Sequence, residues 1–314
     1  MRRYRDFNTY LRDTFGERVQ KIPLDAGLGC PNRDGTISEG GCIYCNSLGS
    51  GTGAWIRHQL SIDEQVIKGR RLAEKRYGAK KFIAYFQSFT NTHAPIEKLK
   101  NLYDQALRHP GMVGLSVGTR PDCVDEDILD LLSSYSKDFM VWIEYGLQSS
   151  HDRTLSAINR GHDVACFERS VLMSVGRGMQ ICAHIILGLP GETRNMMLET
   201  AHYLSTLPIN GVKIHLLYVV KGTPMASLYE KGAYRCLDRE AYVELVVDFL
   251  ERIPQDMVIQ RLTGDPVGEE LVAPEWALNK TENLMLIRRR LEERDTWQGK
   301  TYRISIAGTS NRVT

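Results

Sequence analysis

Short apolar runs alternate with longer amphipathic stretches along most of this chain, and this alternation limits the folds open to it. Strands that alternate with helices form βαβ units, whose strands pair in parallel. Parallel strands are buried on both faces and therefore read as continuous apolar runs. We expect strands at 81–86, 113–117, 140–145, 181–187, 212–217 and 257–260. Helical periodicity is found at 61–77, 95–108, 125–134, 194–207, 239–252 and 280–294.

This pattern predicts an α/β protein with a parallel sheet, which is either an open doubly wound sheet or a barrel. Periodicity alone does not choose between the two. In both, ligands bind at the carboxyl ends of the strands. The residues that follow each apolar run are therefore the first place to look for a site.

Composition is ordinary for a globular protein, and we expect this one in the cytoplasm because its odd number of cysteines comes without an export signal. Of its 314 residues, 42% are hydrophobic and 25% are charged, and the net charge of +2 neither requires nor excludes a nucleic-acid partner. The first residues are charged and form no signal peptide, and we find no apolar stretch long enough for a membrane span. Seven cysteines, an odd number, argue against a disulfide framework.

Three of the cysteines are grouped in a glycine-rich segment. Cys42 follows Cys30 after eleven residues, and Cys45 follows Cys42 after two. A structural zinc normally has four ligands, whereas three thiolates leave one iron of a [4Fe–4S] cluster open to another ligand. A zinc site completed by His58 or His93 and a thioredoxin-like redox pair are the alternatives. The four scattered cysteines are interpreted as structural: Cys123, Cys166, Cys182 and Cys236.

Polar segments follow four of the expected strands. The first is Gln87-Ser88-Phe89-Thr90-Asn91-Thr92, and the others contain GTRPD from Gly118, EYGLQS from Glu144 and HIILGLPGE from His184. Each could be an ordinary loop or turn. Glu144, however, lies inside an apolar strand, where a carboxylate needs a partner or a ligand. A series of polar strand ends downstream of the cysteines predicts one shared site.

These residues resemble the radical S-adenosylmethionine (radical SAM) superfamily, and more closely the branch that holds the elongator catalytic subunit and small bacterial YhcC-type proteins. The resemblance runs from about residue 24 to 266 and rests on the cysteine triad, GTRPD, EYGLQS, NRGH, HIILGLPGE and LYVVKGTPM. It implies a partial (β/α)6 barrel over residues 24–266. Residues 1–23 and 267–314 would then be N-terminal and C-terminal extensions.

The resemblance also implies roles for individual residues. Cys30, Cys42 and Cys45 would ligate three irons, and SAM would chelate the fourth. The predicted SAM-binding residues are Tyr44, Gln87, Ser88, Thr119, Glu144, Gln148, Arg160, His184 and Leu187. An arginine such as Arg160 suits the SAM carboxylate because its guanidinium binds carboxylates bidentately. Lys221 and Glu144 are the predicted catalytic residues.

The implied reaction is reductive cleavage of SAM to a 5′-deoxyadenosyl radical, with the electron delivered by a donor such as flavodoxin or ferredoxin. Relatives in the elongator branch act on the wobble uridine of tRNA. Three basic sets in this chain suit RNA phosphates, although solvated helix faces would look the same: Arg2 to Arg5, Lys68 to Lys81, and Arg288 to Arg294. Without an acetyltransferase domain, remodelling of a side chain already on the uridine is one reaction that fits.

Two alternatives stay open at this point. The same chemistry would suit a small molecule or a tetrapyrrole, because coproporphyrinogen oxidases have similar Gln and Arg spacing. The other alternative is a metal-stabilised RNA-binding module without catalysis, in which Gln148 and Arg160 would tolerate substitution. The series of polar strand ends argues against that module.

Overall fold

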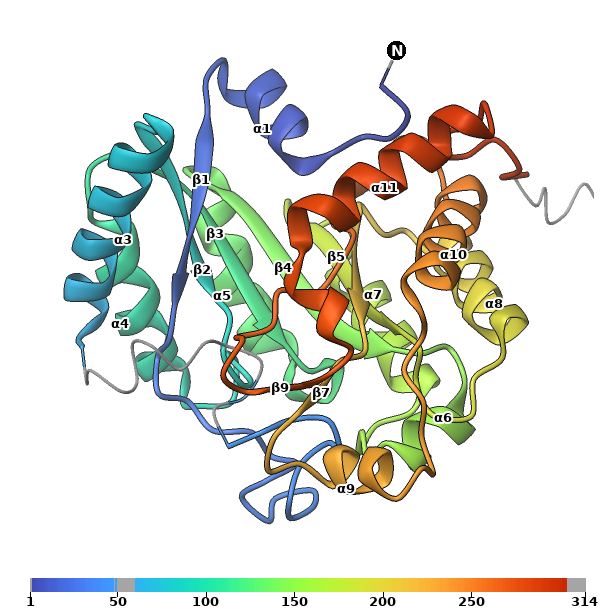
Figure 1. The fold of residues 1–314 in the computed structure, drawn as a ribbon. Coiled ribbons are helices and arrows are strands. Elements are labelled where there is room, and N and C mark those ends of the chain that lie inside the picture. Colours follow the sequence, from blue (N-terminus) through green and yellow to red (C-terminus); the bar gives the residue numbers. More distant parts are fainter. Residues whose placement is uncertain (1, 48, 50–59, 304–314) are drawn as a thin grey trace, which may run out of the picture.

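A seven-stranded parallel sheet, curled into part of a barrel, is the centre of the computed structural model, which describes residues 2–47, 49 and 60–303 (Figure 1). The strand order is β1-β2-β3-β4-β5-β6-β8. This confirms the predicted partial barrel. The strands of this sheet are β1 (Val19–Leu24), β2 (Lys81–Phe86), β3 (Met112–Thr119), β4 (Met140–Gln148), β5 (Gln180–Leu187), β6 (Gly211–Leu216) and β8 (Val258–Arg261).

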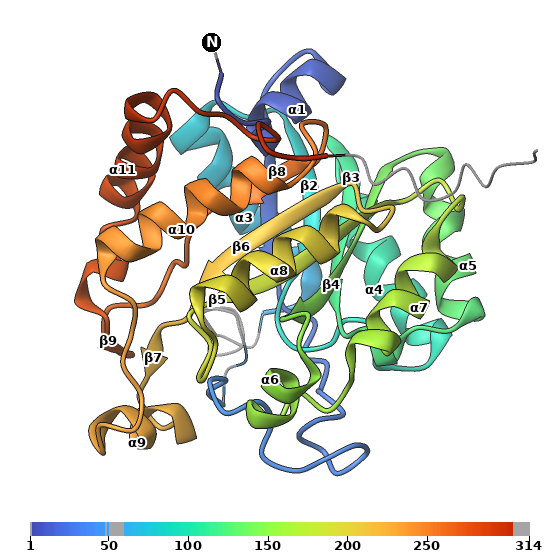
Figure 2. The same cartoon turned by 90° about the vertical axis from the view of Figure 1, so that its right-hand side faces the viewer.

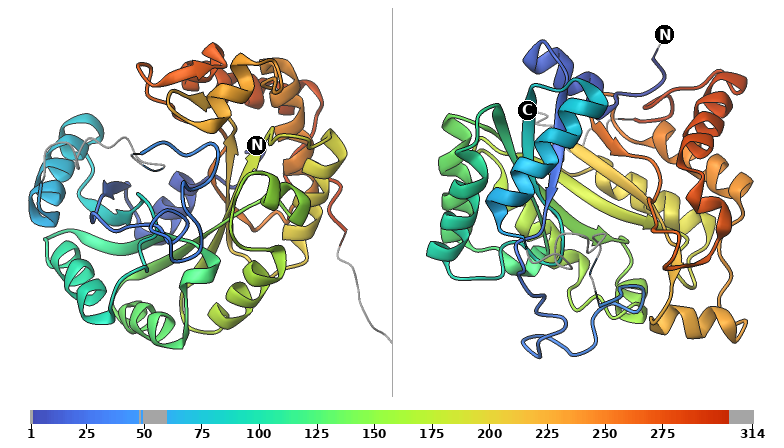
Figure 3. Two further views of the ribbon diagram at one scale, coloured as in Figure 1. Left: turned by 90° about the horizontal axis from the view of Figure 1, so that it is seen from below. Right: turned by 60° about the vertical axis from the view of Figure 1, so that its left-hand side comes forward.

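Helices cover the outer, convex face of the sheet (Figures 2 and 3). Local signals fix where they begin: Ser61 and Glu64 form a capping box at α3, and Asp125 and Thr193 cap α5 and α8. The α-helices are α1 (Phe7–Phe15), α3 (Ile62–Tyr77), α4 (Ile96–Leu107), α5 (Glu126–Ser134), α6 (Asp152–Ala157), α7 (Val164–Ser174), α8 (Arg194–Ser205), α9 (Pro224–Glu230), α10 (Arg239–Arg252) and α11 (Lys280–Glu293).

The main core lies between the sheet and these helices. Leu115 and Val117 of β3, for example, are fully buried in one cluster with Leu99 of α4 and Leu129 of α5. Burying a leucine side chain contributes about 1.5–3 kcal/mol, so the outward face of each strand holds its helix in place. The inward face is thereby left free to line the barrel.

Helix α1 closes the amino-terminal end of the barrel. The rings of Phe7 and Tyr10 meet the Trp142 ring edge-on, at 5.7 and 5.9 Å between centroids. Trp142 is fully buried and packs with Cys182 and Val258. This aromatic plug separates the barrel interior, which we call the lumen, from solvent at that end. The opposite end, at the carboxyl ends of the strands, is the mouth of the barrel.

Strand β1 was not expected and lies, except for Leu24, in the segment predicted as an N-terminal extension. Its sequence, VQKIPL, is interrupted by Lys21 and Pro23. Proline is compatible with this strand because β1 is at the sheet edge and pairs only with β2. The two edges of the sheet approach each other, since Lys21 Nζ of β1 lies 2.7 Å from Gln260 Oε1 of β8.

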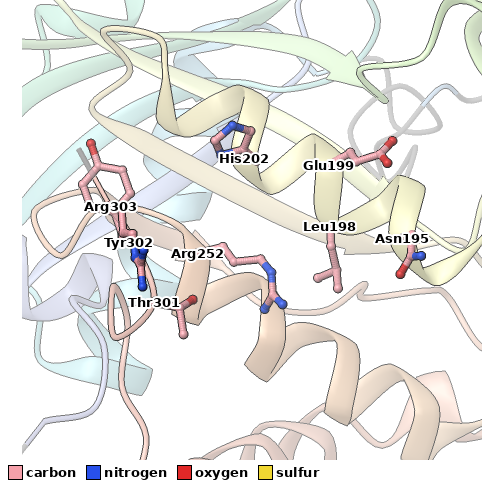
Figure 4. A pocket seen from close by; sticks show the side chains of 8 residues that line it. All are labelled: Asn195, Leu198, Glu199, His202, Arg252, Thr301, Tyr302 and Arg303. Atoms are coloured by element: carbon pink, nitrogen blue, oxygen red, sulfur yellow. The ribbon is translucent and has the colours of Figure 1, made fainter. Parts of the chain in front are cut away.

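The last part of the chain packs on the side of β8. A small antiparallel pair, β7 (Val219–Val220) and β9 (Leu271–Ala273), follows the main sheet, and α11 packs on α10. A hollow of about 530 Å³ lies between α8 and the segment at 301–303 (Figure 4), and no predicted site residue lines it. None of the helices in the described part of the chain has the length and apolarity needed to cross a bilayer.

Candidate functional site

The segment with the three cysteines follows β1 directly and lies across the mouth of the barrel (Figure 3). Its backbone is folded into tight turns: Cys45 N donates to Cys42 O at 2.9 Å, and Arg33 N donates to Cys30 O at 2.8 Å. The Arg33 guanidinium braces the loop by donating to Cys45 O at 2.7 Å. A Cβ on Gly41 would lie 2.7 Å from Arg33 Nε, so glycine is required at that contact.

The environment of the cysteines fits thiolate ligands. Cys42 is buried, and Asn32 Nδ2 and Arg160 Nη1 lie 3.6 and 3.7 Å from its sulfur. Such donors stabilise the anionic sulfur of a ligand thiolate. Burial raises the pKa of Cys45, and the neighbouring Cys42 and Cys30 thiols add to this, so the three sulfurs lie within electrostatic reach of one another.

Within the described residues, no three His, Cys, Asp or Glu side chains are arranged to hold a single metal ion. In a cluster, each thiolate binds a different iron, so its ligands need not converge on one point. The zinc alternative gains no support at His93, which joins no such group within the described residues; its Nε2 lies 2.9 Å from Asp34 Oδ2. His58 lies outside the described residues.

The segment after β2 reaches the cysteine loop through its backbone. Gln87 N donates to Leu24 O at 3.2 Å, and Thr90 N donates to Gly29 O at the same distance. Ser88 is buried here. In the described structure, Thr90 Oγ1 and Asn91 Oδ1 are buried without a hydrogen-bond partner. Buried polar atoms normally have partners, so this end of β2 is built to receive a polar ligand.

Three residues around the mouth have a left-handed backbone, which is costly for residues other than glycine. They are Phe89 after β2 (φ 61°), Gln148 at the end of β4 (φ 77°) and Asn159 before Arg160 (φ 52°). The register of β4 against β5 shifts between Gly146 and Gln148, and this bulge redirects the Gln148 side chain. Strain at three neighbouring loops is typical of a functional site.

Arg160 links the end of β4 to the cysteines. Its Nη2 donates to Gly146 O at 2.8 Å, while Nη1 faces the sulfur of Cys42. Burial acts to lower the pKa of Arg160, but the Cys42 sulfur raises it above its ordinary value. A Cβ on Gly146 would lie 2.6 Å from Arg160 Nη2 and from Gln148 Nε2. The two predicted SAM contacts are therefore brought together, and Gly146 makes the space for them.

Thr119 and Leu187 are two further predicted contacts, and both are buried. Thr119 is buried, and its hydroxyl lies 2.5 Å from that of Thr92. Leu187 is a core residue of β5, and its carbonyl accepts from Leu217 N at 2.9 Å. Tyr44 packs against an apolar cluster that includes Ile186, and burial raises its pKa well above the ordinary value.

Glu144 and His184 lie in the lumen. Glu144 is fully buried and has donors on both oxygens: Lys21 Nζ and Ser116 Oγ at 2.5 Å from Oε1, and His184 Nε2 at 2.8 Å and Lys213 Nζ at Oε2. Lys213 Nζ also donates to Tyr85 OH at 2.8 Å. The carboxylate thus has the partners that its position in an apolar strand demanded.

The lumen shifts the pKa values of Glu144, Lys213 and His184. Burial acts to raise the pKa of Glu144, but Lys21 and Lys213 hold it well below its ordinary value. Burial lowers the pKa of Lys213 to about 7, against the opposing effect of Glu144. Burial, with the Lys213 charge, lowers the pKa of His184 to about 4. At neutral pH, the lumen therefore holds an ionised carboxylate, neutral histidine and a lysine that readily exchanges its proton.

Lys221 lies elsewhere. It follows β7, its side chain is exposed, and its Nζ donates to Glu269 O at 2.7 Å. The structure does not bring it into contact with Glu144, and its catalytic role stays a prediction. Sequence reasoning missed Lys21 and Lys213. For Lys213 the available signal was a charged residue within a predicted strand, the signal that identified Glu144. Lys21 gave no such signal, because β1 was not predicted.

The curled parallel sheet, with a cysteine loop over the carboxyl ends of its strands, defines a partial α/β barrel with a candidate site at its mouth. Comparison with known proteins agrees: residues 27–204 match the model of the Radical SAM superfamily, and residues 209–293 match the Radical SAM C-terminal domain. The chain belongs to the radical SAM superfamily. The cofactors of that superfamily are a [4Fe–4S] cluster and SAM, as the sequence predicted.

Several relatives resemble this chain over most or part of its length. It is 45% identical to the uncharacterized protein YtqA of Bacillus subtilis, over 96% of this chain and 93% of YtqA. It is 38% identical to protein YhcC of Escherichia coli, over 91% of this chain and 92% of YhcC. Elongator complex protein 3 of Saccharomyces cerevisiae is 28% identical over 49% of this chain and 28% of that protein.

Among solved structures, archaeal Elp3 of Methanocaldococcus infernus has a similar fold. The TM-score is 0.68 at 16% identity, covering 89% of this chain and 64% of that chain. This likeness supports the partial barrel. At 16% identity it shows a shared fold and no more. The 38% identity to YhcC confirms the predicted resemblance to YhcC-type proteins.

Proposed function

We propose that this radical SAM enzyme modifies the side chain of a wobble uridine in tRNA. Its resemblance to the elongator branch supports an RNA substrate, and its cysteine loop and lumen support chemistry at the mouth of the barrel. When bound, the cluster and SAM supply radical chemistry, for which a reducing donor such as flavodoxin or ferredoxin provides the electron.

Each group of side chains has a separate task in this proposal. Cys30, Cys42 and Cys45 hold the cluster, while Arg160 and Gln148 orient SAM beside it. The apolar cluster around Tyr44 and Ile186 keeps water from the mouth, which protects a reactive intermediate from side reactions. The lumen beneath receives the part of the substrate that reacts.

The exposed cations of α3 are the observation that carries the RNA assignment. Lys68, Arg71 and Lys75 are exposed, and none forms a salt bridge within the described part of the chain. Helix α3 stands at the edge of the curled sheet beside β1 (Figure 3). A row of free cations favours phosphate backbones, which dominate the affinity of proteins for nucleic acids.

The other two basic sets are engaged in the fold. Arg290 pairs with Glu240 and Glu244, and Arg294 pairs with Glu244, Asp248 and Glu251 across α10 and α11. Near the amino terminus, Arg3 pairs with Asp295, and Arg5 donates to Asp256 O. These sets stabilise the structure, so α3 is the surface that we assign to RNA.

Analysis of tRNA tests the proposed function. Nucleosides from tRNA of a strain that lacks the gene would be compared by mass spectrometry with those of strains carrying the wild type or Cys42→Ala. We expect a wobble-uridine derivative to accumulate without the gene and with Cys42→Ala, and to disappear with the wild type. Identical wobble nucleosides in all three strains would contradict the proposal.

Binding to tRNA provides an independent test of the surface. In the double variant Lys68→Gln/Arg71→Gln, the slope of log affinity against log salt concentration should fall by roughly one for each lost phosphate contact. The control is Arg12→Gln/Lys137→Gln, which removes two exposed cations near the amino-terminal end of the barrel, away from the mouth. Equal slopes for both double variants would argue against α3 as the RNA-binding surface.

A further inference from the structure

We propose that Lys213, His215 and Arg261 form an anion-binding site in the lumen, which receives a carboxylate or a phosphate group of the substrate. This inference deepens the proposed function and rests on it, because it names the chemistry that the substrate presents to the lumen. The site follows from strand register, from donors without partners and from the balance of charge.

Strand register places these side chains on one level of the lumen. Gly146, His184, Lys213 and Arg261 are Cα partners in succession across β4, β5, β6 and β8. Partners in neighbouring strands share a face of the sheet. Lys213 and His184 both contact Glu144 inside the barrel, so Arg261 belongs to the same face. His215, two residues after Lys213, lies on that face as well.

Several polar side-chain groups near Lys213 and Arg261 have no hydrogen-bond partner. His215 Nε2 and Gln260 Nε2 are buried and have no hydrogen-bond partner in the described structure. The Arg261 side chain makes no hydrogen bond or salt bridge with the described residues. Leaving a buried donor unpaired costs about 1–3 kcal/mol, so several together indicate a place where a ligand completes the bonding. Gln260, Arg261 and His215 each keep part of their surface exposed.

The balance of charge decides what kind of ligand fits. Glu144 is the one carboxylate among the described groups that contact this level, and four donors already satisfy it. Lys21, Lys213 and Arg261 supply up to three positive charges against it. Burial, followed by the effect of Arg261, holds the pKa of His215 well below its ordinary value. An anion beside Arg261 and His215 would relieve this excess, because buried charges require partners.

Arginine also sets the geometry of the ligand. A guanidinium presents parallel N–H donors that match two oxygens of a carboxylate or a phosphate. In a tRNA substrate, the first would come from a substituent on the base and the second from the nucleotide backbone. Both sources share one chemistry, so the test needs one probe for each.

Thermal unfolding of the reconstituted enzyme with saturating SAM tests the site without tRNA. The midpoint would be followed against acetate and, separately, against phosphate, with chloride holding the ionic strength constant. A ligand that binds only the folded state raises the midpoint in a saturable way. We expect such a rise with one of the probes. Arg261→Gln should raise its apparent dissociation constant about tenfold or more, as loss of a charge-assisted bond does.

Matched variants separate the site from general salt effects. Arg12→Gln removes an exposed guanidinium and should respond as the wild type does, and Arg261→Lys should respond in between. Should Arg261→Gln fold poorly, the imidazole signals of His215 offer a second readout in the wild type. They should shift with the same probe and be absent in His215→Asn.

The outcomes are distinct. A saturable rise with acetate supports a carboxylate on the base substituent, and one with phosphate supports the nucleotide phosphate. No saturable rise, or an equal rise in wild type and Arg261→Gln, overturns the site. Because the assay contains no tRNA, a positive result together with unmodified wobble uridine would overturn the proposed function alone.

Discussion

The guanidinium of Arg160 lies 3.7 Å from the sulfur of Cys42, although 118 residues separate the two in sequence. The same side chain also donates a hydrogen bond to Gly146 O near the end of β4. A single arginine therefore joins the cysteine loop, the β4 bulge and the loop before α7. This contact explains why two distant motifs, the cysteine triad and NRGH, belong to one site.

Replacement of Arg160 by glutamine should weaken SAM binding about tenfold or more, because the proposed charge-assisted bond to the SAM carboxylate would be lost. Equilibrium dialysis with the reconstituted protein measures this directly. Arg12→Gln, which removes an exposed arginine, should bind SAM as the wild type does. Unchanged affinity in Arg160→Gln would show that this side chain only braces the Cys42 loop.

Gly146→Ala should also impair SAM binding, although alanine adds only a methyl group. Its Cβ would lie 2.6 Å from both Arg160 Nη2 and Gln148 Nε2, so at least one of them must move. Gly268→Ala is the control, because its Cβ meets nothing closer than Leu278 Cδ2 at 3.8 Å. Dialysis and far-ultraviolet circular dichroism together separate a binding defect from misfolding. Equal affinity for both variants would refute the assigned geometry.

Glu144→Gln should be strongly destabilising. Removing one partner of a buried ion pair costs ~3–5 kcal/mol, and here Lys21 and Lys213 would lose their counterion together. Urea unfolding of the anaerobic protein gives the free energy of unfolding. Glu74→Gln breaks the exposed pair with Arg70 and should cost less than ~1 kcal/mol. Similar costs for the two variants would mean that the lumen charges are better solvated than their burial indicates.

Lys213 should make stability depend on pH. Burial lowers its pKa from an ordinary value of 10.5 to about 7, so between these values the unfolded chain binds more protons than the folded one. The free energy of unfolding should therefore rise with pH in that window, and the contribution is lost as pH falls through about 7. Urea unfolding from pH 6.5 to 9.5 should show a steeper rise for the wild type than for Lys213→Met. Parallel curves would refute the shifted pKa.

Much of the fold was predictable, because buried parallel strands are continuous apolar runs. The strand at 81–86 was predicted with the same bounds as β2, and the ends of β3 to β6 and β8 differ from the predicted ones by at most three residues. Strand β1 was missed because Lys21 and Pro23 interrupt its pattern, and both are explained by tertiary structure. Lys21 pairs with Glu144 across the lumen, and Pro23 lies in an edge strand.

The site was predictable only where its residues belong to recognisable sequence motifs. Cys42, Gln148 and Arg160 belong to motifs that could be matched in the sequence, and the structure brings them together. Lys213 and Arg261 belong to no such motif, and only strand register places them on one level with His184. Lys221 stood in a motif, but the fold leaves its side chain exposed on a loop.

We propose that Cys30, Cys42 and Cys45 hold a [4Fe–4S] cluster at which SAM is cleaved. The most direct measurement is anaerobic reconstitution with iron and sulfide, followed by iron analysis and chromatography of 5′-deoxyadenosine after addition of SAM and dithionite. We expect about four irons per chain and 5′-deoxyadenosine from the wild type and from Cys236→Ala, and neither from Cys42→Ala. A wild-type protein that binds only zinc, or a Cys42→Ala variant that still cleaves SAM, would contradict the claim.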